Sequence, residues 1–556
     1  MENLENSKEV EGVMGTPSTS SPWAPFRFRA FTILWVATVV SNIGTWMNDV
    51  GAGWLMASLD PSPVAVSLVQ AATTLPVFLF ALLAGALADM FDRRKLLILV
   101  NVVMAGTASA FAMIVYLDAA TPAFLIGVTF VLGTCAAFVA PAWQAIVPSL
   151  VPKQALQAAI ALNSTGINVS RAIGPALAGV MIVSIGIYAP FALNAVSFVG
   201  IIIALFTWKM TPESNSTLPR EHVLPAIVAG VRYALHSAPL KATLVRAVSF
   251  FLFASAYWAL LPLIAKTSLG GDASSYGILV GSVGVGAVLG ALLLPRLRRR
   301  FGPDVIAMSG TLGTACVLVV FAVVPNLMVA AAGSLLAGAS WIAVLSTLNS
   351  SAQTAMPSWV RARGLSVFIT VFFGAMSLGS IVWGQVAQAA GIPTALMIAA
   401  AGAVILVPLT WRLKLGQGEK LDLAPSAHWP SPVVVHENVR ERSPVMTMIA
   451  YHVAAENHQL FLELTKSLSH ARKRSGAYSW GIMQDAEHPD RFSEYFLETS
   501  WLNHLRHHER VSGSDRIIQD EIRGLLMPCT EPLVTHLLGT SASIKTKSRT
   551  SKGSNQ

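Results

Sequence analysis

Two stripes of polar side chains, each spaced for one face of a helix, are where this sequence could do chemistry. In the first, Asn42, Trp46, Asp49 and Gly53 recur at helical intervals within a long apolar run. A carboxylate near the centre of a membrane helix costs ~2.5–3.5 kcal/mol to insert, which makes Asp49 a functional candidate. We expect Asp49 to bind and release a proton beside a cavity lined by Asn42 and Trp46. The alternative is a position near the membrane surface, since Asp49 lies ~27 Å along a helix from Phe31.

A second stripe lies in a later apolar run, and its members are Ser164, Asn168, Arg171 and Pro175. Arg171 lies ~21 Å along the helix from Gln157, which argues against a side chain that simply reaches the membrane surface. We expect its guanidinium either to pair with a carboxylate, for which Asp49 is the natural partner, or to attract an anionic substrate. The small residues that would form a packing face on the same helix are Gly166, Ser170 and Gly174.

Membrane helices are the elements that must position these stripes. Of the 556 residues, 54% are hydrophobic and only 12% charged, against ~25% in a typical soluble protein. This composition excludes a disordered chain and a nucleic-acid-binding scaffold. A segment of about 20 apolar residues can span the hydrocarbon core of a bilayer. We predict twelve such segments: 31–58, 64–88, 96–117, 122–144, 157–185, 188–208, 243–265, 274–295, 304–324, 327–349, 363–388 and 392–412.

The distribution of basic residues indicates which loops face the cytoplasm. Lys and Arg follow the even-numbered segments, and Lys266 is the exception after an odd-numbered one. Because Lys and Arg concentrate in cytoplasmic loops, we expect both termini to lie inside. The net charge of +9 therefore reflects topology, and we expect no nucleic-acid partner.

The two halves of the apolar region match each other at a constant offset of 205 residues. The matches are Gly85-Ala86-Leu87 with Gly290-Ala291-Leu292, Arg93-Arg94-Lys95 with Arg298-Arg299-Arg300, Pro152 with Pro357, Gly174 with Gly379, and Gly179 with Gly384. Two six-helix halves with the same orientation form a parallel repeat. Such halves rock about a central cavity and expose it to the two sides of the membrane in turn.

On these residues the chain resembles a major facilitator superfamily transporter. The loop after the second segment is similar to the superfamily's signature of a Gly, an Asp and a basic cluster, and it reads Gly85-Ala86-Leu87-Ala88-Asp89-Met90-Phe91-Asp92-Arg93-Arg94-Lys95. Asp92 stands where the general pattern has Gly. Residues 41–47, 50–55 and 170–179 resemble the transmembrane secretion effector branch, which includes enterobactin-type siderophore exporters. The resemblance covers about residues 25–415 and implies an all-α membrane protein with twelve helices in two parallel six-helix repeats.

The resemblance also implies roles for individual residues. An ion-pair latch in the basic loop would hold the outward-open state, although the basic cluster could instead merely set topology. A glycine and a proline in the fifth helix resemble the antiporter signature, in which they permit bending. The residues of the latch are Gly85, Asp89, Arg93 and Arg94, and those of the bend are Gly174, Pro175 and Gly179.

Residues 433–540 change character after a linker that contains several prolines. We predict strands at 445–453, 478–484, 492–499 and 534–538, and helices at 456–474, 501–510 and 514–525. This β-α-β-β-α-β order predicts an α+β ferredoxin-like domain. Residues 472–481 and 500–506 resemble the antibiotic-biosynthesis-monooxygenase-like domains, which pair as dimeric barrels, so dimerisation through this domain is implied.

His504 and His508 have the i, i+4 spacing that can bind zinc, but no third ligand is evident. We interpret this cluster, with His507 and Arg506, as a charged and solvated helix face. We therefore expect no resident metal and no catalytic residues, and a sensing or dimerisation module in preference to an oxygenase.

The predicted organisation is a tail at 1–24, a six-helix bundle at 25–208, a cytoplasmic loop at 209–242, a second bundle at 243–415, a linker at 416–432, the soluble domain at 433–540 and a tail at 541–556. The predicted function is proton-coupled efflux of a siderophore, drug or other small molecule across a bacterial inner membrane. Its partners would be the substrate, protons and the lipid bilayer. The sequence contains no Gly-x4-Gly-Lys-Ser/Thr loop, so ATP drive and a cofactor are not expected. The alternatives are a transporter fused to a cargo-modifying enzyme, an importer of a small metabolite and a non-transporting scaffold.

Overall fold

The computed structural model describes residues 21–208, 223–426, 428–429 and 444–539. Most of the predicted N-terminal tail, the first part of the central loop, the end of the linker, the start of the predicted soluble domain and the predicted C-terminal tail lie outside these residues. The chain forms two compact units. One contains the first six helices with Val248–Ser346 and Ile369–Leu409, and the other contains Arg220–Ala247, Thr347–Phe368 and the chain from Thr410 onward.

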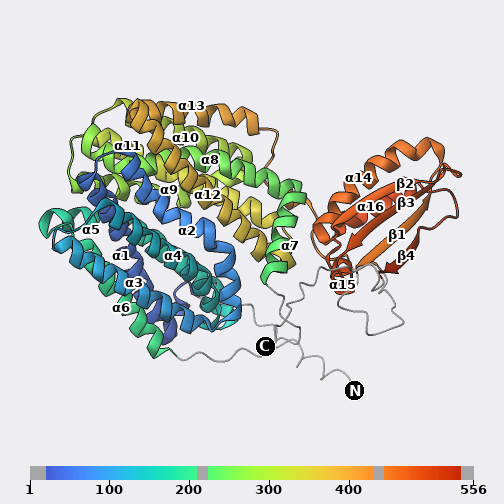
Figure 1. Ribbon diagram of the computed structural model, residues 1–556, viewed down its shortest axis with the longest axis horizontal. Helices are drawn as coiled ribbons and strands as arrows, with labels where there is room; N and C mark the ends of the chain where they lie inside the picture. Colours follow the sequence, from blue (N-terminus) through green and yellow to red (C-terminus); the bar gives the residue numbers. More distant parts are fainter. Residues whose placement is uncertain (1–20, 209–222, 427, 430–443, 540–556) are drawn as a thin grey trace, which may run out of the picture. The chain divides into compact units, whose positions relative to one another are not determined.

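Twelve helices are long and apolar enough to cross a membrane, and each lies on one of the predicted segments (Figure 1). Their bounds are α1 Arg29–Leu59, α2 Pro63–Met90, α3 Arg93–Tyr116, α4 Pro122–Ile146, α5 Leu156–Ser184, α6 Ala189–Thr207, α8 Ala238–Leu263, α9 Ala273–Arg300, α10 Pro303–Val323, α11 Leu327–Thr354, α12 Ser358–Ala390 and α13 Ile392–Thr410. The ends differ from the predicted ones by a few residues; α9 and α11, for example, continue into polar residues beyond their apolar runs.

Side-chain caps fix where several of these helices begin. Ser62 accepts a hydrogen bond from the Ala65 amide, and Thr121 accepts one from Phe124. Each such cap contributes about 1 kcal/mol. Many apolar side chains on the outer surfaces of these helices, such as Val183 and Leu292, are exposed in the protein alone. A lipid environment would cover them, as expected of a multi-pass membrane protein.

The predicted cytoplasmic segment 209–242 contains a short helix that is not among the predicted elements, α7 Val223–His236. The helix buries Tyr233 and Ala234. The Tyr233 hydroxyl donates to the Ala355 carbonyl at 2.9 Å. Tertiary packing of one apolar face therefore makes this segment helical, although it is too short to span a membrane.

The C-terminal domain has the predicted β-α-β-β-α-β order. Its elements are β1 Val445–His452, α14 His458–Ser475, β2 Ser479–Gln484, β3 Arg491–Glu498, α15 Trp501–Arg510, α16 Gly513–Gly524 and β4 Leu533–Leu538. The four strands form an antiparallel sheet in the order β2-β3-β1-β4. Alternate residues of β1 are buried, and two of them, Ile449 and Tyr451, share a hydrophobic cluster with Phe461 of α14 and Ile522 of α16. Figure 1 shows α14 and α16 beside the sheet. The ferredoxin-like prediction is confirmed.

Candidate functional site

The small-residue face predicted on α5 packs against α1. The Ser170 hydroxyl donates to the Val39 carbonyl at 3.1 Å. A Cβ atom at Gly174 would lie 2.9 Å from the carbonyl oxygen of Ile43 and 2.7 Å from the Cβ of Trp46. Because only glycine permits this approach, the sequence of α5 brings its polar stripe next to that of α1.

Arg171 faces aromatic rings from both halves of the chain. Its Cζ atom lies 5.3 Å from the centroid of the Trp46 ring. The guanidinium also interacts electrostatically with the hydroxyl of Tyr257, a fully buried residue of α8. The Nε atom of Arg171 is buried and has no hydrogen-bond partner among the described residues. Since a buried donor without a partner is costly, this guanidinium has capacity for a further acceptor.

The backbone at Arg171 is also unusual. Pro175 has no N–H group, so the Arg171 carbonyl lacks the hydrogen bond that a helix would normally supply four residues on. A Cβ atom at Gly284 of α9 would lie 2.6 Å from this carbonyl oxygen. One at Gly277 would lie 2.7 Å from the Pro175 carbonyl oxygen. The proline in the predicted bend therefore lies where α5 meets α9 backbone to backbone.

Asp49 is half-buried on the same face of α1 as Trp46. The Asn48 side chain is hydrogen-bonded to it, and its carboxylate interacts electrostatically with Tyr276 of α9. The predicted pairing of Asp49 with Arg171 is not observed, because no ion pair joins these two described residues. Each charged group instead faces a tyrosine from the second half of the chain.

Further contacts between the two halves gather toward the end of the bundle at which α1 and α5 finish. The Lys266 ammonium donates to the Ala57 carbonyl at 2.7 Å and lies 5.9 Å from the Trp54 ring centroid. Trp54 stacks on Tyr276 at 6.3 Å between centroids. A Cβ atom at Gly384 of α12 would meet the side chain of Ser67 on α2. In this conformation the halves are therefore in contact at that end.

An aromatic cluster in the second half adjoins Tyr257. Trp258 lies next to it in α8 and contacts Trp341 of α11, with ring centroids 5.6 Å apart. Phe251 contacts both Trp341 and Phe372. Sequence reasoning missed Tyr257 and Tyr276. Each places a hydroxyl group in an apolar helix, α8 or α9. Polar groups are rare in such helices, and the same argument identified Asp49 as a candidate.

The remaining predicted cavity residues are less distinctive. Asn42 is half-buried on α1, and Asn168 donates to the Ser164 carbonyl of its own helix at 2.9 Å. Asn163, which directly precedes Ser164 in α5, accepts from the Trp143 indole at 3.1 Å. Asn163 therefore connects α5 to α4, whereas the Asn168 side chain forms its hydrogen bond within α5.

The basic loop is held by two capping interactions. Asp92, the residue that departs from the superfamily pattern, caps α3 by accepting from the Lys95 amide at 3.1 Å. The Arg94 guanidinium donates to the carbonyls of Leu205 and Phe206 at the end of α6, at 2.8 and 3.0 Å. Arg94 is thus a helix C-cap as well as a latch candidate. Gly85 lies in α2, and the side chain of Asp89 is outside the described part of the chain.

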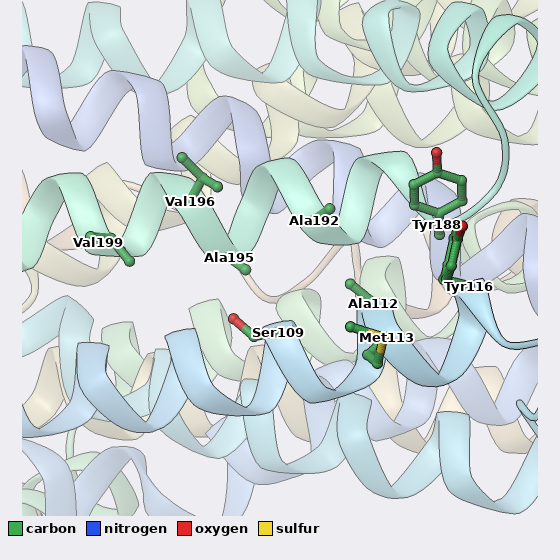
Figure 2. A pocket seen from close by; sticks show the side chains of 9 residues that line it. All are labelled: Ser109, Ala112, Met113, Tyr116, Tyr188, Ala192, Ala195, Val196 and Val199. Atoms are coloured by element: carbon green, nitrogen blue, oxygen red, sulfur yellow. The ribbon is translucent and has the colours of Figure 1, made fainter.

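A crevice between α3 and α6 is lined mainly by apolar side chains (Figure 2). Figure 2 shows Ser109, Ala112 and Met113 of α3 facing α6, with Tyr116 and Tyr188 at one end. The rings of these two tyrosines are 5.0 Å apart. Val196, which also lines the crevice, is among the most exposed apolar residues of α6. The crevice therefore opens at the surface of the bundle, and neither Asp49 nor Arg171 lines it.

The C-terminal domain contains a buried polar network centred on Glu494. Its carboxylate accepts from the Arg472 guanidinium at 3.0 Å, the Tyr451 hydroxyl at 2.8 Å and the Trp480 indole at 2.9 Å. Burial raises the pKa of Glu494, but Arg472 and these hydrogen bonds outweigh it, so the pKa lies below its usual value. A carboxylate so fully satisfied stays ionised and specifies the packing of the domain.

The prediction of a solvated histidine face on α15 is wrong. His504 and His507 are buried, and both Nδ1 atoms are hydrogen-bonded to the Glu498 carboxylate, at 2.6 and 2.7 Å. Burial opposes ionisation of Glu498, yet the two imidazoles outweigh it and lower its pKa. Burial and the neighbouring imidazoles lower the pKa of His508 to about 3, so this ring is neutral. The helix turns its histidines inward because β3 supplies a buried acceptor.

A bundle of twelve membrane-length helices in two halves, with buried charged groups between them, defines a membrane transporter. The family model described as transmembrane secretion effector matches residues 20–544. The chain belongs to this family, and the match takes in the C-terminal sheet domain as well as the helices.

Curated relatives are similar over roughly half to three-quarters of this chain. The multidrug efflux pump Tap of Mycobacterium tuberculosis is 25% identical over 434 residues, which cover 73% of this chain and 98% of the pump. The enterobactin exporter EntS of Citrobacter koseri is 25% identical, covering 57% of this chain and 75% of that exporter. The staphyloferrin A transporter of Staphylococcus aureus is 26% identical, and the match spans 47% of this chain and 65% of that transporter.

Solved structures share the fold at low identity. The nucleoside transporter NupG gives a TM-score of 0.57 at 13% identity, covering 69% of this chain and all of that one. A bacterial homologue of the human lysosomal transporter Spinster gives 0.54 at 15% identity, covering 70% of this chain and 95% of that one. These likenesses establish the transporter fold of the helical region.

Proposed function

We propose that the protein exports an amphipathic, anionic small molecule in exchange for protons by alternating access. The observation that carries this proposal is the buried Nε atom of Arg171, which has no described hydrogen-bond partner and lies between aromatic groups of both halves. A planar guanidinium next to indole and phenol rings suits a ligand that combines a carboxylate or similar anion with an apolar or aromatic body. The names of the relatives, which are exporters of siderophores and drugs, agree with this class of cargo.

Asp49 is the proposed proton carrier. Asp49 follows Trp46 by three positions on the same face of α1, and it lies next to Tyr276 of the second half. Opening of the halves at this end would separate Asp49 from Tyr276 and admit water. By the distribution of basic loops, we place this end on the extracytoplasmic side, with both termini in the cytoplasm of a bacterial cell.

Replacement of Arg171 by glutamine tests the cargo site. A hydrogen bond to a charged group contributes about 1.5–3 kcal/mol, so the KM for an anionic cargo should rise roughly 10- to 150-fold. The full chain would be reconstituted in vesicles with an imposed pH gradient, and transport of an anionic and a neutral fluorescent dye of similar size would be measured with and without an uncoupler. Arg171→Lys is the matched control, because it keeps the charge without the planar fork. An equal loss for both dyes, or transport of neither by the natural chain, would contradict the proposal.

We also propose that Gly85, Asp89 and Arg93 form a gate at the opposite end, with Arg94 anchoring α6. Replacing Asp89 by asparagine should then slow transport strongly while expression and topology are retained. Asp92→Asn is the matched control, since it lies in the same loop but caps α3. If Asp89→Asn transported as well as the natural chain at equal protein level, the gate would be contradicted. The basic cluster would then serve only to set the membrane topology.

The C-terminal domain is proposed to be a binding or dimerisation module. Its edge strand β4 exposes Leu533, Val534 and Leu537. An open antiparallel edge with apolar side chains can pair with a second copy. The resemblance to dimeric monooxygenase-like domains supports this arrangement, and a fused cargo-modifying enzyme is the second candidate.

A further inference from the structure

Three histidines converge beside the sheet of the C-terminal domain. His504 and His508 lie one turn apart on α15, and His536 comes from β4. One ring nitrogen from each of the three lies within 4.8 Å of the others. The His536 ring centroid is 4.7 Å from that of His504. The third ligand that the sequence does not reveal is thus brought in by pairing of β4 with β1.

The ring nitrogens of His504 and His508 face each other. Their Nε2 atoms are 3.1 Å apart. The Nδ1 atom of His504 contacts Glu498 Oε2 at 2.6 Å, so the proton of a neutral ring resides on Nδ1 and the Nε2 lone pair points toward His508. Two nitrogens bound to one tetrahedral Zn²⁺ at ~2.0–2.1 Å are about 3.3 Å apart, close to the observed separation.

The surroundings match those of a histidine-ligated metal. Metal-binding histidines usually donate their other N–H to a carboxylate, which fixes the ring and raises its basicity. Glu498 does this for His504 and is itself held by His507 at 2.7 Å. The Nδ1 atom of His508 is buried and has no hydrogen-bond partner among the described residues, so this ring, unlike that of His504, has no carboxylate to orient it. The Trp501 ring packs against His504, and the Trp429 ring packs against His508.

We propose that His504, His508 and His536 bind a Zn²⁺ ion, with Glu498 as the carboxylate that orients His504. Imidazole nitrogens are common ligands of zinc, and His508 and His536 are only partly buried, which leaves room for a fourth ligand from solvent. The ion would tie α15 to the edge strand β4 and would offset the buried charge of Glu498.

The experiment is metal binding by the full chain, purified in detergent through an affinity tag without histidines and stripped with a chelator. Zn²⁺ is titrated against a chromogenic chelator, and Co²⁺ is added separately to record the visible bands of a tetrahedral site. We expect one equivalent per chain and an intense Co²⁺ spectrum. His536 is a half-buried residue of the exposed edge strand β4. His536→Gln should weaken Zn²⁺ binding at least about 10-fold and abolish the tetrahedral spectrum.

His488→Gln is the matched control, because His488 is an exposed histidine near the carboxylate of Asp485 in the same domain. It should bind Zn²⁺ as the natural chain does. Circular dichroism of the stripped proteins separates loss of a ligand from loss of fold, and His508→Gln provides a second ligand variant. Zn²⁺ binding that is equally tight in His536→Gln, His508→Gln and His488→Gln, or no binding by the natural chain at tens of micromolar zinc, would overturn the site.

Discussion

Replacement of Asp49 by asparagine should reduce transport driven by a pH gradient to the level of vesicles without protein. Asparagine keeps the shape of the side chain and its contacts with Asn48 and Tyr276, but it cannot exchange a proton at physiological pH. The measurement is dye movement into vesicles under an imposed gradient. Exchange of labelled for unlabelled dye, which needs no net proton movement, should persist in the variant and shows that the protein is folded.

Asp60→Asn is the matched control for this prediction. Asp60 follows α1 directly, outside the helix, and accepts from the Ser62 amide at 3.0 Å. This variant should keep gradient-driven transport. If Asp49→Asn retained full gradient-driven transport, the proton carrier would have to be another group. If it lost exchange as well, Asp49 would be needed for cargo binding or folding.

Replacement of Gly284 by alanine should shift the protein away from the conformation in which α5 and α9 meet. The added Cβ would lie 2.6 Å from the Arg171 carbonyl oxygen and 2.7 Å from the Cα of Ala172, both backbone atoms that cannot rotate away. Overpacking of this kind costs about 1–3 kcal/mol, which corresponds to a roughly 5- to 150-fold change in the ratio of the two conformations. Transport should fall because one half of the cycle becomes less populated.

Gly281→Ala is a control on the same face of α9, where the added Cβ would make only ordinary contacts of 3.6 Å and longer. Spin labels on cysteines introduced at Ser58 and Thr267, with the exposed Cys316 and Cys529 replaced by serine, would report the distance between the halves. We expect a longer distance population to grow in Gly284→Ala and not in Gly281→Ala. Identical distance distributions in both variants would contradict a gating role for this contact.

The sequence predicts the architecture well because the signals are local and strong. Twelve apolar runs and the alternating burial of β1 each reflect a single element and its environment. The missed helix α7 shows the limit. Its helicity depends on burial of Tyr233 against residues more than a hundred positions away, and no local pattern reveals that contact.

The sequence predicts the parts of the candidate sites whose residues all lie within one chain segment. The polar stripes of α1 and α5 follow from helical spacing, and their packing follows from Gly166, Ser170 and Gly174. The partners of Asp49 and Arg171 come from the second half, so spacing cannot supply Tyr276 or Tyr257. The same reason explains the histidines: His504 and His508 are visible as a pair, but His536 joins them only through strand pairing.

The main-chain contact between α5 and α9 should tolerate substitutions less well than the aromatic residues nearby. A contact made by main-chain atoms has no side chain that selection could exchange for a better one, and nearly every substitution at Gly277 or Gly284 would enlarge it. The aromatic residues around Tyr257 and Trp341 carry no such restriction. We therefore expect changes of cargo to arise at the aromatic residues, while the contact between α5 and α9 keeps its glycines.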